Sequence, residues 1–271
     1  MAERIDVALV TGGATGVGRD VAVGLGRAGY AVAVLARSAD TLANTRSLLE
    51  AESIPVVARA VDVRSAEAVA DAVAFVESEL GPISVVVNGA GTALAIGPLW
   101  EVDTCDWWTD VETTVGGAFN VCRAVVPRMI ERRAGLIVNV SSYAAVRPVP
   151  YLSAYGIAKA GLASMTESLA ASLQPYRVRA FTVTPGVVDT ALMWRLKESP
   201  AGRRWLPELR DRPSLDPQLF VRLVVALAGG DLDVLNGRFL HALDDLDDLV
   251  DRIGEIESEE LYVPRLRRLP A

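Results

Sequence analysis

Short apolar runs recur along the chain, and segments with a helical pattern of apolar positions lie between most of them. A run without polar alternation is typical of a strand that is buried on both faces of a parallel sheet. Alternation of such strands with amphipathic helices predicts an α/β chain with a doubly wound, seven-stranded parallel sheet. The expected strands cover residues 5–10, 31–35, 56–60, 83–87, 136–140, 178–183 and 238–240.

Helical segments between these strands carry apolar residues at three- and four-residue spacing. This spacing places the apolar side chains on one helix face, which would cover the sheet. Residues 103–133 predict either one long helix or a broken pair of helices. The other expected helices cover residues 19–28, 39–52, 65–80, 153–173 and 217–228. A chain of 271 residues is long enough for one large α/β domain, which we expect over residues 1–271.

Composition and charge narrow the class of function. Hydrophobic residues form 51% of the chain, which excludes a disordered protein, and a formal net charge of −7 argues against a nucleic-acid partner. No apolar run is long enough to span a membrane, and the amino terminus lacks the pattern of a signal peptide. We therefore expect a soluble, cytoplasmic protein with no membrane partner.

Metal-binding residues are sparse. Cys105 and Cys122 lack metal-ligand spacing, and we expect both to be reduced and buried or half-buried. The only histidine of the sequence, His241, is expected at a surface or an interface. No metal site is therefore predicted.

A glycine-rich turn follows the first strand and precedes the first helix. In this context glycines allow the backbone to approach a pyrophosphate, and the helix offers free N–H groups at its positive end. An ordinary tight turn is the alternative, but the strand and helix flanks favour a dinucleotide site of a Rossmann-type fold. The expected contacts come from Gly12, Thr15, Gly16, Val17 and Gly18.

The end of the second strand bears on the choice of cofactor. An acid at this place pairs with the ribose 2′-hydroxyl of NAD, whereas an arginine accommodates the 2′-phosphate of NADP. The strand ends without an acid, and Arg37 stands just beyond it. NADP(H) is therefore favoured, with NAD(H) as the alternative and a solvated loop charge as the other interpretation of Arg37.

Tyr155 and Lys159 are four residues apart and would share one face of a helix. A free tyrosine has a pKa of about 10, and a nearby cation favours the phenolate. Lys159 is therefore expected to lower the pKa of Tyr155, so that this phenol acts as a general acid or base. Ser142 follows the strand 136–140, at the sheet edge where α/β proteins present their sites, and its hydroxyl would bind a substrate oxygen.

The Ser142, Tyr155 and Lys159 set, taken together with the turn at residues 11–18, resembles the short-chain dehydrogenase/reductase family. The resemblance covers about residues 5–241. It implies hydride transfer between NADP(H) and a carbonyl/alcohol substrate, with Tyr155 as acid or base and Lys159 also contacting the nicotinamide ribose.

Further cofactor contacts are implied by this resemblance. Asp62 would lie beside the adenine with the Val63 backbone in reach, and a helix cap is the alternative for Asp62. Residues 88–91 resemble the NNAG motif of the family with glycine as the second residue, and Asn88 would also tie the central strands together. Residues 185–190 resemble its PGxxxT motif. The implied set is Asp62, Val63, Asn88, Ala90, Gly91, Pro185, Gly186, Val188 and Thr190.

Thr114 departs from the family pattern. An active-site asparagine is expected at this position, where it helps to hold a water that links the lysine to solvent. A threonine hydroxyl is shorter, but it can donate and accept a hydrogen bond. We expect activity to be retained, with an impaired proton relay as the alternative.

Two segments extend the expected domain. Residues 191–217, rich in prolines, would form a substrate lid in which Trp194 or Trp205 packs on a substrate and basic residues meet an anion, or in which the charges are simply solvated. The acidic extension over residues 243–271 predicts an amphipathic helix packed on the domain or on a partner subunit.

The sequence predicts an NAD(P)-dependent oxidoreductase of the ketoreductase type that acts on a small molecule. Two alternatives stay open. One is redox-neutral chemistry on the same fold, such as dehydration or epimerisation. The other is a cofactor-binding sensor or scaffold without turnover. The resemblance also implies a homodimer or homotetramer, formed through the helices at 103–133 and 153–173.

Overall fold

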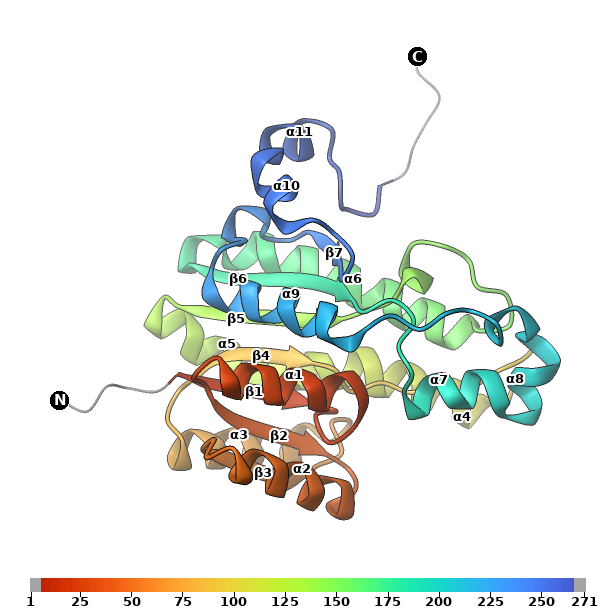
Figure 1. Cartoon of the computed structure of the whole chain (residues 1–271), viewed down its shortest axis with the longest axis horizontal. Helices are drawn as coiled ribbons and strands as arrows, with labels where there is room; N and C mark the ends of the chain where they lie inside the picture. Colours follow the sequence, from red (N-terminus) through yellow and green to blue (C-terminus); the bar gives the residue numbers. More distant parts are fainter. Residues whose placement is uncertain (1–5, 266–271) are drawn as a thin grey trace.

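The computed structural model describes residues 6–265 and confirms the predicted α/β fold (Figure 1). Its seven strands form one parallel sheet in the order β3-β2-β1-β4-β5-β6-β7. The chain order reverses beside β1, and ligands of doubly wound sheets bind at such a switch point. The strands are β1 (Val7–Thr11), β2 (Ala31–Ala36), β3 (Val56–Ala60), β4 (Ile83–Asn88), β5 (Gly135–Val140), β6 (Val178–Thr184) and β7 (Phe239–His241).

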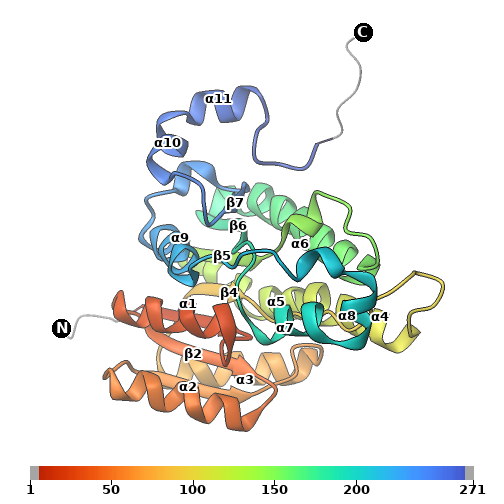
Figure 2. The same cartoon turned by 45° about the vertical axis from the view of Figure 1, so that its right-hand side comes forward.

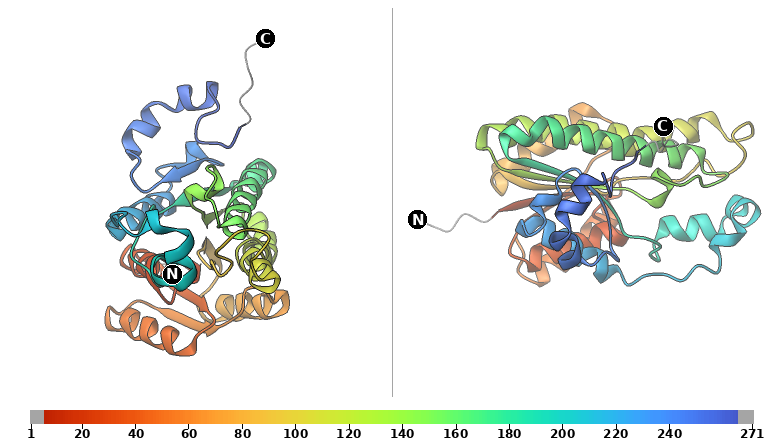
Figure 3. Two further views of the ribbon diagram at one scale, coloured as in Figure 1. Left: turned by 90° about the vertical axis from the view of Figure 1, so that its right-hand side faces the viewer. Right: turned by 90° about the horizontal axis from the view of Figure 1, so that it is seen from above.

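Helices cover both faces of the sheet (Figure 3). One face packs on α1 (Gly16–Arg27), α2 (Ala39–Ala51) and α9 (Pro217–Gly229), and the other on α3 (Ala66–Glu79), α5 (Gly117–Arg132) and α6 (Ser153–Leu173). Successive residues of β1 enter opposite layers: Ala8 and Val10 join the first core, and Val7 and Leu9 join the second. This double burial explains why the strands are continuous apolar runs.

The segment 103–133 forms a broken pair of helices. The first helix, α4 (Thr104–Val111), begins at Asp103, whose carboxylate accepts a hydrogen bond from the Asp106 N–H. A π-helical turn over Glu112–Gly116 separates it from α5. Single π-helical turns of this kind are frequent at functional sites. This turn carries Thr113 and Thr114.

The predicted lid region is largely helical. It contains α7 (Ala191–Glu198), α8 (Pro200–Trp205) and the short helix Pro207–Leu209, and it lies beyond the end of the sheet where β4 and β5 finish (Figure 2). Ser199 ends α7 and caps α8 through a hydrogen bond from the Gly202 N–H. The other single-turn helices are Tyr143–Ala145, Gln174–Tyr176 and Asp233–Leu235.

The acidic extension contains two short helices, α10 (Leu246–Asp251) and α11 (Ile253–Ser258), instead of the one predicted helix. Leu249 and Ile256 are buried and join the core layer of α1 and α9. The chain then returns along β7, where the Phe239 N–H donates to the Tyr262 carbonyl over 2.7 Å. This contact partly covers the edge strand of the sheet. Residues 266–271 of the predicted extension, and Ile5 of the first predicted strand, lie outside the described residues.

Two sequence predictions about single residues are corrected. Cys105 is exposed, whereas Cys122 is buried as expected. His241 is only 7% exposed, because it ends β7 inside the domain and stacks on Tyr143 with ring centroids 4.9 Å apart. Among residues 6–265, no helix is long and apolar enough to cross a membrane. The same part of the chain gathers no group of His, Cys, Asp and Glu residues suited to a metal ion.

Candidate active site

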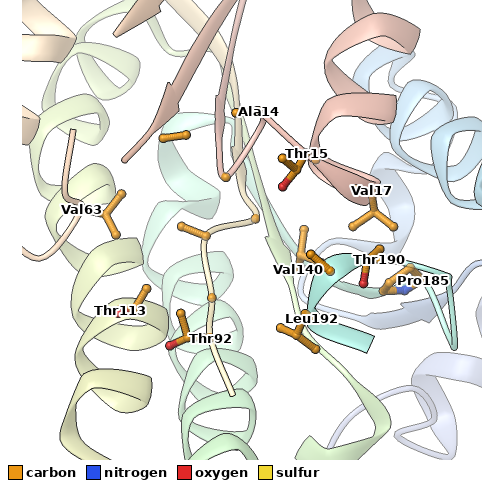
Figure 4. Close-up of a pocket in the computed structure, with 18 of the residues that line it drawn as sticks. Ala14, Thr15, Val17, Val63, Thr92, Thr113, Val140, Pro185, Thr190 and Leu192 are labelled. Carbon is orange, nitrogen blue, oxygen red and sulfur yellow. The ribbon is translucent and has the colours of Figure 1, made fainter. Parts of the chain in front are cut away.

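A pocket of about 710 Å³ opens at the carboxyl ends of the central strands (Figure 4). Its walls come from the glycine turn, the loops after β2 and β4, the start of α6 and residues 185–193. Most of the predicted cofactor residues lie here. They are Gly12, Thr15, Gly16, Val17, Gly18, Arg37, Val63, Ala90, Gly91, Tyr155, Lys159, Pro185, Gly186, Val188 and Thr190.

The glycine turn forms a narrow backbone cradle at one end of this pocket. Gly12 has a φ of +66°, and a Cβ atom there would lie 2.9 Å from the Ala90 nitrogen. The absence of side chains lets the strand end, the loop after β4 and the amino end of α1 approach each other. Free N–H groups and the positive helix end favour a diphosphate. This cradle fits a dinucleotide, and the fit rests on the arrangement of the protein backbone.

The loop after β2 supplies a cationic end of the pocket. Arg37 is exposed and lines it together with Ser38 and Thr41. Ser38 caps α2 by accepting a hydrogen bond from the Thr41 N–H, so the positive end of a 13-residue helix faces the same place. Sequence reasoning missed Ser38 and Thr41; a polar cap directly after Arg37 was the available signal.

Asp62 was predicted to lie beside the adenine of the cofactor, but it is not among the residues that line the pocket. Arg64 donates to both of its carboxylate oxygens, and the Arg64 N–H donates to one of them over 3.0 Å. The Arg64 guanidinium holds the pKa of Asp62 below its usual value, and Arg37 contributes to the same effect. Asp62 is therefore engaged by its own neighbour, whereas Val63 lies in the pocket wall.

Asn88 lies in the sheet and not at the pocket wall. Its side-chain amide donates to Asn139 on β5 over 2.8 Å, and Asn139 donates to Thr166 on α6 over 2.8 Å. This chain of hydrogen bonds ties β4, β5 and α6 together, in agreement with the structural role expected for Asn88. Asn88 is not among the residues that line the pocket, whereas the neighbouring Gly89, Ala90 and Gly91 are, and its contact with the cofactor stays a prediction.

Ser142, Tyr155 and Lys159 meet at the end of β5. Tyr155 lies in the first turn of α6, and the nearby Ser142 hydroxyl lowers the pKa of its phenol. Lys159 is buried, and its Nζ donates to the Val140 carbonyl over 2.7 Å. Tyr155 and Lys159 line the pocket, whereas Ser142 is not among its lining residues. The i, i+4 spacing does place the two side chains on one helix face, as predicted.

The acidity of Tyr155 differs from the sequence prediction. Burial raises the pKa of Tyr155, the Ser142 hydroxyl lowers it, and the carboxylate of Asp110 raises it further. Burial also lowers the pKa of Lys159 to about 8. The lysine Nζ lies 5.6 Å from the centroid of the tyrosine ring and is bonded to Val140. The protein groups alone therefore favour a protonated phenol, and the predicted lowering by Lys159 is not supported.

Three threonine hydroxyls surround this corner of the pocket without a hydrogen-bond partner among the described residues: Thr92, Thr113 and Thr114. Thr92 and Thr113 line the pocket, and Figure 4 shows both. Thr114 is 1% exposed and does not line it. A Cβ atom on Gly91 would lie 3.4 Å from the Thr114 Oγ1 and 3.5 Å from the Lys159 Nζ, which places both groups against one point. Unpaired buried hydroxyls are unfavourable, so they indicate a polar ligand or water.

The lid contacts the site through apolar residues. Ala93, Ile96, Leu152, Leu196 and Leu206 form a buried cluster that contacts Tyr155, Leu192, Met193 and Trp205. Trp205 also packs on Tyr151, with ring centroids 4.8 Å apart, whereas Trp194 is 66% exposed. The basic residues of the lid do not line the pocket, which agrees with the alternative of solvated charges.

Comparison with known proteins agrees with this geometry. A family model described as short chain dehydrogenase matches residues 6–201. The chain belongs to this family. The matched region of this short-chain dehydrogenase contains the glycine turn, Ser142, Tyr155 and Lys159, and ends within α8.

Relatives extend the comparison to most of the chain. The protein is 34% identical to a short chain dehydrogenase of Pseudocercospora fijiensis, over 94% of this chain and 87% of that protein. It is 34% identical to 2,3-dihydro-2,3-dihydroxybenzoate dehydrogenase of Bacillus subtilis, over 70% and 72% of the two chains. A variant of actinorhodin polyketide ketoreductase, crystallised with NADPH, matches with a TM-score of 0.82 and 30% identity, over 89% of this chain and 97% of that one.

Proposed function

We propose that this short-chain dehydrogenase transfers a hydride between NADP(H) and a carbonyl/alcohol substrate. The observation that carries the proposal is that Tyr155 and Lys159 line the same pocket as the glycine cradle, with the Ser142 hydroxyl near the phenol. A cofactor in the cradle would therefore reach the side chains that handle the substrate oxygen.

Each side chain of the site has a defined role in this proposal. In reduction, the Tyr155 phenol donates its proton to the carbonyl oxygen, and the hydroxyl of Ser142 orients the phenol and the substrate. Lys159 is held at the pocket by the Val140 carbonyl and would bind the nicotinamide ribose. Fixed donors then meet the negative charge that develops on the oxygen. The nicotinamide cofactor supplies or accepts the hydride when bound.

The proposed cofactor is NADP(H). Arg37 and the amino end of α2 supply positive charge at the end of the pocket where an adenosine ribose would lie. Among similar structures, the ketoreductase above was solved with NADPH, and a gluconate 5-dehydrogenase of Burkholderia cenocepacia was solved with NADP and tartrate. The latter is 27% identical, with a TM-score of 0.78 over 88% of this chain and 94% of that one.

Arg37→Asp tests the cofactor proposal. The KM for NADPH is expected to rise by about 10-fold or more, because hydrogen bonds to a charged phosphate contribute about 1.5–3 kcal/mol. The KM for NADH should change much less, since NADH has no 2′-phosphate. Arg46→Asp is the matched control, because Arg46 is exposed, lies on α2 and pairs with Glu50. Steady-state kinetics with both cofactors measures the effect, and equal changes in the two KM values would refute the assignment.

The substrate is proposed to be a medium-sized, partly apolar ketone or alcohol. Leu192 and Met193 line the pocket together with Tyr155, and all three pack on a buried apolar cluster that contains no charged side chain. Such a wall favours a substrate whose reacting group is polar and whose remainder is apolar. Redox-neutral chemistry and cofactor sensing remain the rival functions.

Thr114 is proposed to keep the proton relay working in place of the expected asparagine. Its unpaired hydroxyl and the Lys159 amine lie against the same point beside Gly91, where a water would join them. Activity should therefore depend on the hydroxyl.

Two substitutions at Thr114 test this role. Thr114→Val keeps the shape and removes the hydroxyl, and we expect turnover to fall about 10-fold, the equivalent of one hydrogen bond. Thr114→Asn should change turnover by less than this. The measurement is kcat for NADPH-dependent reduction. Unchanged turnover in Thr114→Val would exclude the hydroxyl, and a rise of 10-fold or more in Thr114→Asn would mean that the native relay is impaired.

We also propose that the protein forms a homodimer or homotetramer in the cytoplasm. Phe119 on α5 and Ile157 on α6 are 51% and 54% exposed, which leaves apolar surface on the helices expected to associate. Size-exclusion chromatography with light scattering measures the number of subunits.

A panel of ketones and alcohols, supplied with NADPH, NADP, NADH or NAD, tests the function itself. Hydride transfer predicts a change in the absorbance of reduced nicotinamide. Product formation with bound cofactor and no such change would favour dehydration or epimerisation. Cofactor binding in a calorimeter, without turnover of any compound, would favour a sensor.

A further inference from the structure

Asp110 is a buried carboxylate close to the candidate active site. It lies in the last turn of α4 and is 0% exposed. Sequence reasoning gave it no role. Burial of a charged group is unfavourable unless the group is hydrogen-bonded. The hydrogen-bond partners of Asp110 therefore indicate which part of the chain it holds in place.

Those partners are two backbone amides of the loop after β4. The Leu94 N–H donates to both carboxylate oxygens over 2.9 and 2.8 Å, and the Ala95 N–H donates to Oδ2 over 3.0 Å. Consecutive amides of this kind form a local anion site. Asp110 therefore clamps the loop at residues 94–95, between Gly91 beside Lys159 and Ile96 in the lid cluster.

The clamped loop and the helix that carries Asp110 both adjoin Tyr155. Ala93 and Ile96 belong to the apolar cluster that contacts the Tyr155 side chain. One turn before Asp110, the Trp107 indole N–H donates to Ser153 over 3.1 Å, two residues before Tyr155. The Asp110 carboxylate is thus fixed between a loop and a helix that both adjoin the phenol, which must change its protonation state in turnover.

We propose that Asp110 is a positioning residue that holds the loop 92–96 against Tyr155, and that its buried negative charge favours carbonyl reduction over alcohol oxidation near neutral pH. The inference rests on the proposed function. It assigns to a residue outside the Ser-Tyr-Lys set a preference for one direction of the reaction.

The charged groups around Tyr155 determine the direction in which removal of the Asp110 charge should shift the pKa of the phenol. Lys159 lies on the same helix as Tyr155, Asp110 lies on α4 and raises the pKa of the phenol, and Ser142 at the end of β5 is neutral. The surrounding lid residues, Leu192 and Met193, are apolar. A nearby negative charge disfavours the phenolate and raises the pKa of the phenol. Removing the charge should therefore let Tyr155 ionise at lower pH. The rate of oxidation, which needs the phenolate, should therefore rise at neutral pH. The rate of reduction, which needs the phenol, should begin to fall at a lower pH.

The test uses the holoenzyme and a substrate found in the carbonyl and alcohol panel. The pH profiles of oxidation and reduction are measured for the wild type, Asp110→Asn and Asp110→Ser. Both variants keep an acceptor oxygen without the charge. Asp106→Asn is the control, because it removes the same charge from an exposed position on α4. Circular dichroism and NADPH affinity identify the variants that fold.

The expected result is that the rising limb of oxidation moves to lower pH in the Asp110 variants, with oxidation at least about threefold faster at neutral pH. The falling limb of reduction moves in the same direction, and Asp106→Asn changes neither. Profiles that do not move, whatever happens to kcat, would overturn the proposal. Failure of both neutral variants to fold would also overturn it, since Asp110 would then be structural. A wild type without turnover would instead refute the proposed function.

Discussion

Tyr155→Phe is expected to lower turnover by at least ~100-fold, since general acid–base catalysis contributes about 10²–10⁴-fold. The phenol lines the pocket near the Ser142 hydroxyl and is the titratable group placed to exchange a proton with a substrate oxygen. Phenylalanine keeps the ring among the apolar residues around it and removes only the hydroxyl. The fold and the NADPH affinity should therefore be preserved.

The measurement is kcat for reduction of a ketone, together with calorimetric titration of NADPH. Tyr176→Phe is a suitable control, because Tyr176 follows α6 near its far end and is 39% exposed. Turnover within a few-fold of the wild type in Tyr155→Phe would remove this residue from the chemistry. Loss of turnover together with loss of NADPH binding would point to damage of the site.

Gly18→Ala should weaken NADPH binding by about 100-fold. A Cβ atom on Gly18 would lie 2.4 Å from the Gly12 carbonyl oxygen and 2.9 Å from its carbon. These are backbone atoms of the cradle, so they cannot move aside as a flexible side chain would. Overpacking of a tight site contributes about 1–3 kcal/mol of strain, and the upper end applies here because the amino end of α1 must shift.

Calorimetric Kd values for NADPH and thermal unfolding without cofactor separate the two effects of this substitution. Gly254→Ala is the matched control, because a Cβ atom there would have no neighbour within 4 Å. An NADPH affinity for Gly18→Ala within about twofold of the wild type would mean that the turn between β1 and α1 does not hold the diphosphate.

The fold was largely predictable because its signals are local and repeated. Each buried strand is a short apolar run, and β3 has the predicted limits, residues 56–60. The π-helical turn at Glu112–Gly116 was not predictable, since a single wider turn leaves apolar spacing almost unchanged. The division of the acidic extension into two helices was also missed, because a single residue, Arg252, separates them.

The part of the site that is formed by the backbone was predictable. The part that depends on which partner a side chain takes was less predictable. The glycine turn, Tyr155 and Lys159 lie in one pocket as expected. The Asp62 carboxylate accepts a hydrogen bond from Arg64, two residues away. The spacing of residues in the sequence does not predict this partner. The acidity of Tyr155 depends on burial and on Asp110, whose partners lie 15 and 16 residues away in the sequence.

Stoichiometry in the wild-type enzyme tests the central claim most directly. With a ketone from the panel, the loss of NADPH is followed by its absorbance, and the alcohol formed is quantified by chromatography in the same sample. Hydride transfer predicts that one NADPH is consumed for each alcohol produced. Product that forms while the NADPH remains unchanged would contradict the account.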